Sequence, residues 1–145
     1  MENLLIALNL VGTLEVMIAI SIGAFAGIVF GAIPGLTYSM ALALMLPFTF
    51  TMEPVTGISL LLATYIGGMT GGSISAILIG IPGTPSAAAT AADGYAMTKR
   101  GDASIALGTA VIVSTIGGLI SLIIMILLVD FISKFAIKFG PAEIF

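Results

Sequence analysis

The stretch that decides the fold is ILIGIPGTPSAAAT, residues 77–90, which lies within a long apolar run. Between Gly80 and Thr90 it places two prolines, two glycines and three hydroxyl residues. Proline removes a helical hydrogen bond, and the backbone groups that it frees are costly to leave unpaired in lipid. The stretch therefore predicts a helix that is interrupted at this point rather than one continuous membrane span.

The composition around this stretch is that of a membrane protein. The chain has 145 residues with a mean hydropathy of +1.28, and 59% of them are hydrophobic. Charged residues make up 8%, far below the roughly 25% of a soluble domain. Too few polar residues remain to cover a soluble surface. We therefore expect an all-α polytopic membrane protein with about 4–6 membrane segments.

The same composition excludes several classes of function. The chain has no cysteine, histidine or tryptophan, which removes disulfides, thiol catalysis and histidine chemistry. Its seven acidic and four basic residues are scattered, so no basic patch indicates a nucleic-acid partner. The run GIPGTPS lacks the lysine of a phosphate-binding loop, and no Gly-x-Ser-x-Gly elbow or metal-ligand cluster occurs. We predict neither enzyme activity nor a cofactor.

Apolar segments divide the chain at turn signals. Thr13 is placed to cap the helix that precedes the first break, with Glu15 in its first turn. We expect a helix from Val55 to about Thr70, then a turn at Gly71-Gly72-Ser73 and a short half-helix, because glycines cluster there. The other apolar segments expected are 16–33, 36–50 and 103–129.

Polar residues are confined to short stretches between and after these segments. Residues 93–95 and 99–102 are expected to form the one strongly polar loop. Near the end of the chain, Lys134 and Lys138 stand four residues apart among phenylalanines, which is typical of an interfacial helix. Basic residues therefore flank both ends of one span. We give preference to a cytoplasmic Lys99-Arg100 loop.

The tripeptide Ile-Pro-Gly occurs twice, at residues 33–35 and 81–83, and hydroxyl residues follow each copy. A helix broken at membrane depth exposes carbonyls at one end and N–H groups at the next start. Such N-termini attract carboxylates, and unwound carbonyls coordinate Na⁺. The alternative is a kinked helix or a tight hairpin with no ligand. The candidate substrate-binding residues are Pro34, Gly35, Thr37, Ser39, Pro82, Gly83, Thr84, Pro85, Ser86 and Thr90.

Two further features bear on packing and on ion coupling. Gly23, Gly27 and Gly31 recur every four residues, so they line one helix face and let another backbone approach closely. Asp93 follows the second break and is a candidate for holding a coupling Na⁺ or carrying a proton. Asp93 is equally suited to capping a loop, because aspartate beside glycine is common in turns.

These residues resemble a known family, the large membrane subunit of tripartite tricarboxylate transporters (the TctA family). The resemblance rests on GIVFGAIPGL at residues 27–36 and on GGSISAILIGIPGTPSAAATAADGY at residues 71–95. The KRG that follows at residues 99–101 and the closing FGPAEIF are also similar. The match runs over nearly the whole chain.

The resemblance implies a multi-pass subunit of the bacterial inner membrane that imports citrate or other carboxylates with an ion gradient. The partners it implies are a small membrane subunit and a periplasmic solute-binding protein, beside membrane lipid. It assigns the binding site to the two Pro-Gly breaks. Members of the family are several times longer, so we expect residues 1–145 to be a single transmembrane domain, the N-terminal part of a larger transporter fold.

Two functions of other classes stay open at this point. The chain is alternatively a non-transporting scaffold subunit that packs through its Gly-x-x-x-Gly helix faces. It is alternatively a channel-forming oligomer that conducts without a solute-binding protein.

Overall fold

The computed structural model describes residues 9–136, and these form helices joined by short connections, with no strand among them. Three helices are long and apolar enough to cross a membrane, α2, α4 and α6, and α3 is a shorter apolar helix. The all-helical prediction is thus confirmed. The bounds are α2 Leu14–Ala32, α3 Tyr38–Thr49, α4 Pro54–Ile79, the 3-10 helix η1 Pro85–Ala87, α5 Ala88–Lys99 and α6 Ala103–Ala136.

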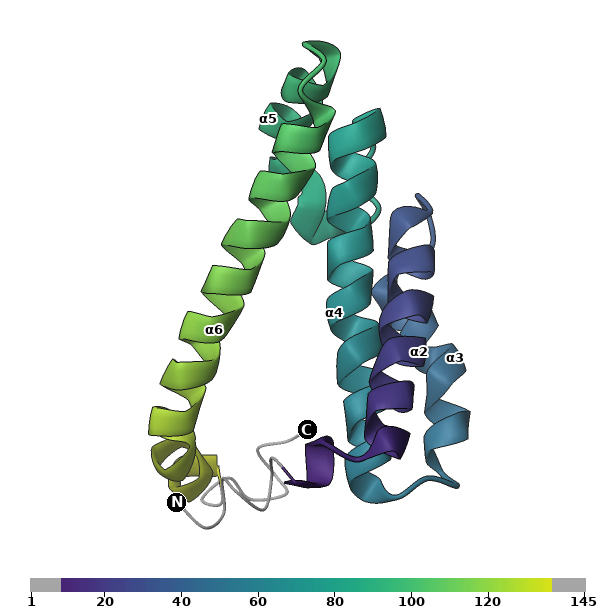
Figure 1. Ribbon diagram of the computed structural model, residues 1–145, viewed down its shortest axis with the longest axis vertical. Helices are drawn as coiled ribbons and strands as arrows, with labels where there is room; N and C mark the ends of the chain where they lie inside the picture. Colours follow the sequence, from purple (N-terminus) through teal and green to yellow (C-terminus); the bar gives the residue numbers. More distant parts are fainter. Residues whose placement is uncertain (1–8, 137–145) are drawn as a thin grey trace. The chain divides into compact units, whose positions relative to one another are not determined.

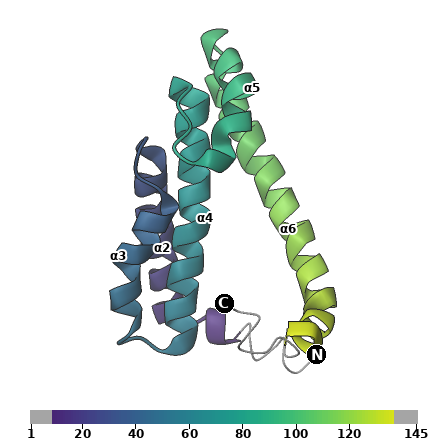
Figure 2. The same cartoon turned by 180° about the vertical axis from the view of Figure 1, so that it is seen from behind.

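The chain divides into two compact units, the first ending at Gly108 and the second beginning at Thr109 within α6. In the first unit, α4 lies between the α2–α3 pair and α5 in both views (Figures 1 and 2). In the second unit, every side chain described from residue 111 onward is exposed. The candidate site therefore lies entirely in the first unit.

Helix α2 runs parallel to α4 in direct backbone contact. Gly23 lies against Leu60 and Thr64, and Gly31 lies against Gly68. Residue numbers rise in the same direction along both helices, so the helices are parallel. A Cβ built on Gly27 would lie 2.7 Å from the Gly68 nitrogen, closer than any side chain allows. The prediction that the glycine repeat lets another backbone approach closely is confirmed.

The predicted turn at Gly71-Gly72-Ser73 is wrong, because α4 continues unbroken from Pro54 to Ile79. The clustered glycines pack against other segments of this chain, and the helix does not bend there. A Cβ on Gly71 would lie 2.9 Å from the Ala32 nitrogen of α2. The close packing that this permits offsets the weak helix propensity of glycine, which is about 1 kcal/mol per residue.

The predicted polar loop is shorter than expected, because residues 93–95 belong to α5. The alanines that precede Asp93 favour a helix, and Gly94 brings α5 against the side chain of Ile77. The chain turns only after Lys99, where Gly101 adopts a φ of 93°. Helix α6 then runs without interruption to Ala136, so Lys134 continues that helix, while Lys138 lies outside the described residues.

Candidate functional site

Both Pro-Gly breaks end a helix, as predicted, and each uses a glycine in the left-handed region of backbone space. Helix α2 ends at Ala32, and Gly35 has a φ of 95°. Helix α4 ends at Ile79, where Gly80 has a φ of 72° and its N–H donates to the Ala76 carbonyl. The Tyr95 ring covers Gly80, with Cδ1 2.6 Å from the position of a Cβ. This ring leaves no room for a side chain at residue 80.

After α4 ends, the chain turns back along it and forms a hairpin, residues 80–99. The Gly83 N–H donates to the Gly72 carbonyl over 3.4 Å, and the Ser86 hydroxyl reaches the Met69 sulfur at 3.4 Å. From Ile79 back to Met69 is a rise of about 15 Å along a helix. Helix α5 then returns, and the Thr98 hydroxyl donates to the Ile77 carbonyl over 2.7 Å. The break therefore sits against the middle of α4.

Gly83 is the point where the second break meets the end of α2. A Cβ built on Gly83 would overlap the Gly31 carbonyl oxygen and lie 2.8 Å from the Ser75 hydroxyl oxygen. Gly83 itself is buried. The last turn of α2 leaves carbonyls without partners inside that helix. The contact therefore brings the carboxyl end of α2 to the second break.

Thr84 is the most enclosed hydroxyl residue of the site, with 1% of its surface exposed. Its side chain fills the space that the missing side chain of Gly72 leaves, and Cγ2 would lie 2.7 Å from a Cβ there. Its hydroxyl lies 3.1 Å from the Ser86 hydroxyl. Since a thioether accepts but cannot donate, Ser86 donates to Met69 and Thr84 donates to Ser86. The Thr84 hydroxyl oxygen is also the atom nearest to a Cβ built on Gly72, so it lies against α4.

At the first break, α3 begins, and the Thr37 hydroxyl that follows the break is used to cap this helix. Thr37 caps α3, and its hydroxyl oxygen accepts from the Met40 N–H over 3.4 Å. Next to it, the Tyr38 side chain packs on Gly68 of α4 and meets Tyr65 edge to face at a ring separation of 5.2 Å. The start of α3 and the end of α2 therefore meet α4 at the same level.

The structure brings some of the predicted site residues together and leaves others apart. Gly83, Thr84 and Ser86 gather on α4 beside the end of α2. Thr90 is half-buried in the first turn of α5. Pro82 and Pro85 belong to the second break and are exposed. Thr37 is half-buried, and the remaining predicted residues are exposed without a hydrogen bond to the second break among those described: Pro34, Gly35, Ser39 and Asp93.

Several residues of the site were missed by the sequence reasoning. Met69, Gly72 and Ser75 of α4 line the contact with the second break, and Ser75 donates to the Gly72 carbonyl over 3.0 Å. The carbonyl of Gly31 belongs to it as well. The signal in the sequence was the glycine cluster at 67–72, which we interpreted as a turn and which is the floor of the site.

Neutral polar groups alone surround this contact. Its hydroxyls and backbone groups come from the end of α2, the middle of α4 and the second break, and none of these residues carries a charge. Helix starts favour anions and helix ends favour cations by typically 0.3–1 kcal/mol each. This contact therefore offers hydrogen-bonding groups and helix dipoles without a fixed charge.

Comparison with known proteins places the chain in a family. Residues 17–145 match the family described as the tripartite tricarboxylate transporter TctA family. The chain is also similar to an uncharacterized 52.8 kDa protein of the TAR-I ttuC′ 3′ region of Agrobacterium vitis, with 39% identity over 124 residues. That match covers 86% of this chain and 25% of the relative, so the chain spans about a quarter of the relative's length. No solved structure matches.

Proposed function

This chain belongs to the tripartite tricarboxylate transporter TctA family, a family of transport proteins rather than enzymes, and on that premise we propose what it carries. It supplies the N-terminal portion of a membrane subunit that imports tricarboxylates or related organic acids. The observation that supports this most is the enclosed Thr84, which stands where the second break, α4 and the end of α2 meet. A broken helix at membrane depth requires a polar partner, and a carboxylate provides one.

The proposed cradle is built from the two breaks and the floor that α4 provides. Backbone N–H groups at the start of α3 and the N–H of Ser86 face the carboxylates of the solute, while Thr84 and Ser86 provide hydroxyl groups. Pro85 has no N–H, and the Ala87 N–H donates to the Thr84 carbonyl. The carbonyls at the end of α2 suit a cation, which makes this edge of the site suitable for a coupling Na⁺. Asp93, exposed on α5, is the candidate to hold that ion or to carry a proton instead.

The proposed setting is the bacterial inner membrane, with uptake driven by a Na⁺ or H⁺ gradient. A small membrane subunit and a periplasmic solute-binding protein are the proposed partners, because both belong to transporters of this family. The structure argues against the scaffold alternative in one respect. The glycine face of α2 that would serve a scaffold is already filled by α4 within this chain.

Uptake of a labelled tricarboxylate by the complete transporter tests this function. Thr84→Val removes the hydroxyl at nearly constant volume, and Ser86→Phe places a ring at the tip of the hairpin. We expect either substitution to reduce uptake at least about tenfold, as the loss of a solute contact of about 1.4 kcal/mol would.

The control is Thr51→Phe, at an exposed position in the turn between α3 and α4. It should leave uptake unchanged, and all three variants should reach the membrane in equal amounts. Full uptake by both Thr84→Val and Ser86→Phe would exclude this break as the binding site.

A further inference from the structure

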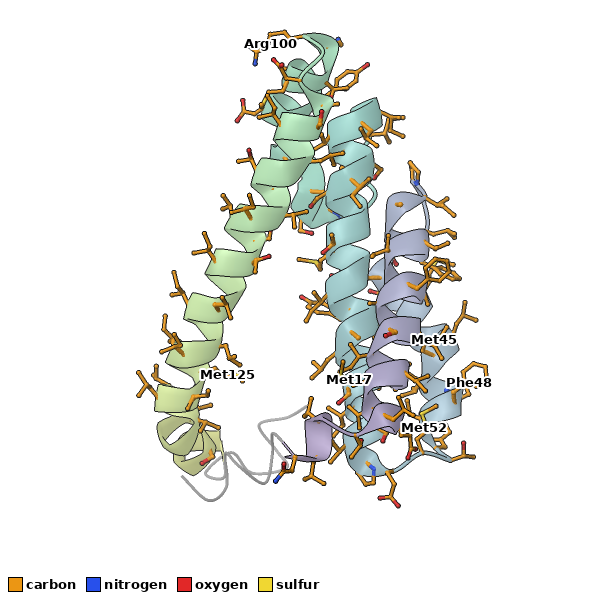
Figure 3. The ribbon with its side chains drawn as sticks, in the orientation of Figure 1. Met17, Met45, Phe48, Met52, Arg100 and Met125 are labelled. Atoms are coloured by element: carbon orange, nitrogen blue, oxygen red, sulfur yellow. The ribbon has the colours of Figure 1, made fainter. Side chains whose placement is uncertain are left out.

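A cavity lies in the first unit, at the end remote from the helix breaks. It has a volume of about 350 Å³ and opens between α2, α3 and α4. Figure 3 shows Met45, Phe48 and Met52 together at the end of the unit where α2 begins. The residues that line it are Glu15, Ile18, Ala19, Ile22, Met45, Phe48, Met52, Thr56 and Leu60.

This end pocket is apolar apart from its rim. Its volume falls in the range of small-ligand sites, about 300–1,000 Å³. Methionine and phenylalanine form the wall on the side of α3, and methionine adapts its shape to flexible apolar ligands. An apolar chain therefore fits the interior of this pocket.

Glu15 provides the charge at the rim. It stands in the first turn of α2, is exposed, and forms no hydrogen bond or ion pair with the other described residues. Lys99 and Arg100 are the basic residues of the first unit, and they lie at the opposite end of α4, since Thr98 bonds to Ile77. The pocket thus combines an apolar interior with a negative charge, at the expected membrane boundary, that no described basic residue of the first unit opposes.

We propose that this end pocket binds an aminophospholipid, with an acyl chain between α2 and α3 and the primary ammonium group of the headgroup at Glu15. Charge complementarity selects this class of lipid. A primary ammonium donates charge-assisted hydrogen bonds to a carboxylate, a quaternary ammonium has no N–H to donate, and an anionic headgroup is repelled. The site is separate from the proposed solute cradle and does not depend on it.

A unique tryptophan in the pocket tests the proposal, because the chain has no tryptophan of its own. Phe48→Trp places the fluorophore on the wall, at a side chain that is 60% exposed. The chain is reconstituted in bilayers that contain brominated phosphatidylethanolamine, phosphatidylcholine or phosphatidylglycerol, and quenching is measured. We expect phosphatidylethanolamine to be preferred over phosphatidylcholine by about two- to fivefold, the range that an exposed ion pair supplies, with phosphatidylglycerol weakest.

Three matched variants decide between lipid selection and general lipid contact. In the Phe48→Trp background, Glu15→Gln should abolish the preference, while Glu53→Gln, the acid at the same end that does not line the pocket, should retain it. Leu62→Trp, an exposed probe on α4 outside the pocket, should be quenched equally by all three lipids.

A second measurement covers the case in which Phe48→Trp fails to fold. Native mass spectrometry of the unsubstituted chain should retain phosphatidylethanolamine, and Glu15→Gln should lose it. Equal quenching by the three lipids together with equal retention by Glu15→Gln would overturn the proposal. Equal quenching would also be the result if another protein segment fills the pocket.

Discussion

At the scale of single residues, the candidate site depends on the absence of side chains. Gly83 and Gly72 let the second break lie directly on α4, and Gly31 brings α2 to the same point. At Gly31 and Gly83 a methyl group would meet backbone atoms that cannot move independently, and at Gly72 it would meet the buried side chain of Thr84. Thr84 then fills the remaining space. The geometry of the site is therefore sensitive to the smallest substitution.

Gly83→Ala tests this sensitivity. The added methyl group would overlap the Gly31 carbonyl and lie 2.8 Å from the Ser75 hydroxyl oxygen. We expect it to lower the free energy of unfolding by about 1–3 kcal/mol, the usual cost of overpacking. The control is Gly108→Ala, where the new methyl group meets nothing within 4 Å, so helix propensity should raise stability by up to about 1 kcal/mol. Circular dichroism during detergent unfolding measures both. Equal effects of the two substitutions would contradict the packing described.

Gly80→Ala probes the end of α4 in the same way, for two separate reasons. A residue with a side chain at a φ of 72° costs about 1–2 kcal/mol, and the Tyr95 ring blocks the Cβ. Tyr95→Ala removes the ring but leaves the backbone cost. We therefore expect the double variant to be less destabilised than the sum of the single variants, by at least about 0.5 kcal/mol. Strict additivity in the unfolding measurements would show that the ring does not restrict residue 80.

At the scale of elements, the hairpin that contains η1 and α5 is held on α4 by a few specific contacts. In the part that leaves α4, the Gly83 N–H donates a hydrogen bond to the Gly72 carbonyl. In α5, which returns, the Thr98 hydroxyl donates a hydrogen bond to the Ile77 carbonyl. Gly94 sits on Ile77 between them. Since α5 is alanine-rich and only Gly94 of it is buried, hydrophobic burial contributes little to its position. Its attachment relies on glycine contacts and hydrogen bonds.

Thr98→Val tests this attachment. The substitution keeps the shape of the side chain and removes the 2.7 Å bond to Ile77, which should destabilise the hairpin by about 1 kcal/mol. Hydrogen exchange in α5 should become faster by the corresponding factor of about five. Thr115→Val is the matched control, because the Thr115 hydroxyl bonds only to Val111 of its own helix. Unchanged exchange in α5 would show that other contacts fix the hairpin.

At the scale of the whole first unit, the two basic residues lie at one end of α4 together with Asp93 and Asp102, and two glutamates lie at the other end. Glu53 directly precedes the first residue of α4, and Glu15 stands in the first turn of α2 at the same end because α2 and α4 are parallel. Lys99 and Arg100 stand near the other end, where α5 returns to Ile77. Basic residues favour the cytoplasmic side. In the orientation that we prefer, with Lys99 and Arg100 in the cytoplasm, the hairpin that contains the second break therefore lies toward the cytoplasmic side.

Single cysteines test this orientation, since the chain has no cysteine. In intact cells, a membrane-impermeant maleimide should label Glu53→Cys and should leave Lys99→Cys unlabelled until the membrane is opened. Both positions are exposed, so a difference in labelling reflects the side of the membrane. Labelling of Lys99→Cys alone would reverse the orientation, and with it the side on which the end pocket lies.

Local sequence patterns predicted the elements more closely than the packing between them. The four-residue glycine repeat of α2 and the two Pro-Gly breaks were read correctly, because helix periodicity and proline act over a few residues. The cluster at Gly71 and Gly72 was misread as a turn. Glycine weakens an isolated helix, but it also allows another helix to pack closely against it. Which effect applies depends on whether such a helix is present, and the local sequence does not show that.

The sequence alone determined that the chain is a helical membrane protein, that its helices break at Pro34-Gly35 and Pro82-Gly83, and that it resembles the TctA family. Composition and backbone chemistry are properties of the residues themselves, so they can be read directly. The tertiary structure alone decided that the second break turns back onto the middle of α4 and meets the carbonyl of Gly31. That contact joins residues about fifty positions apart, and it exists because three glycines leave a space that Thr84 and the backbone can share.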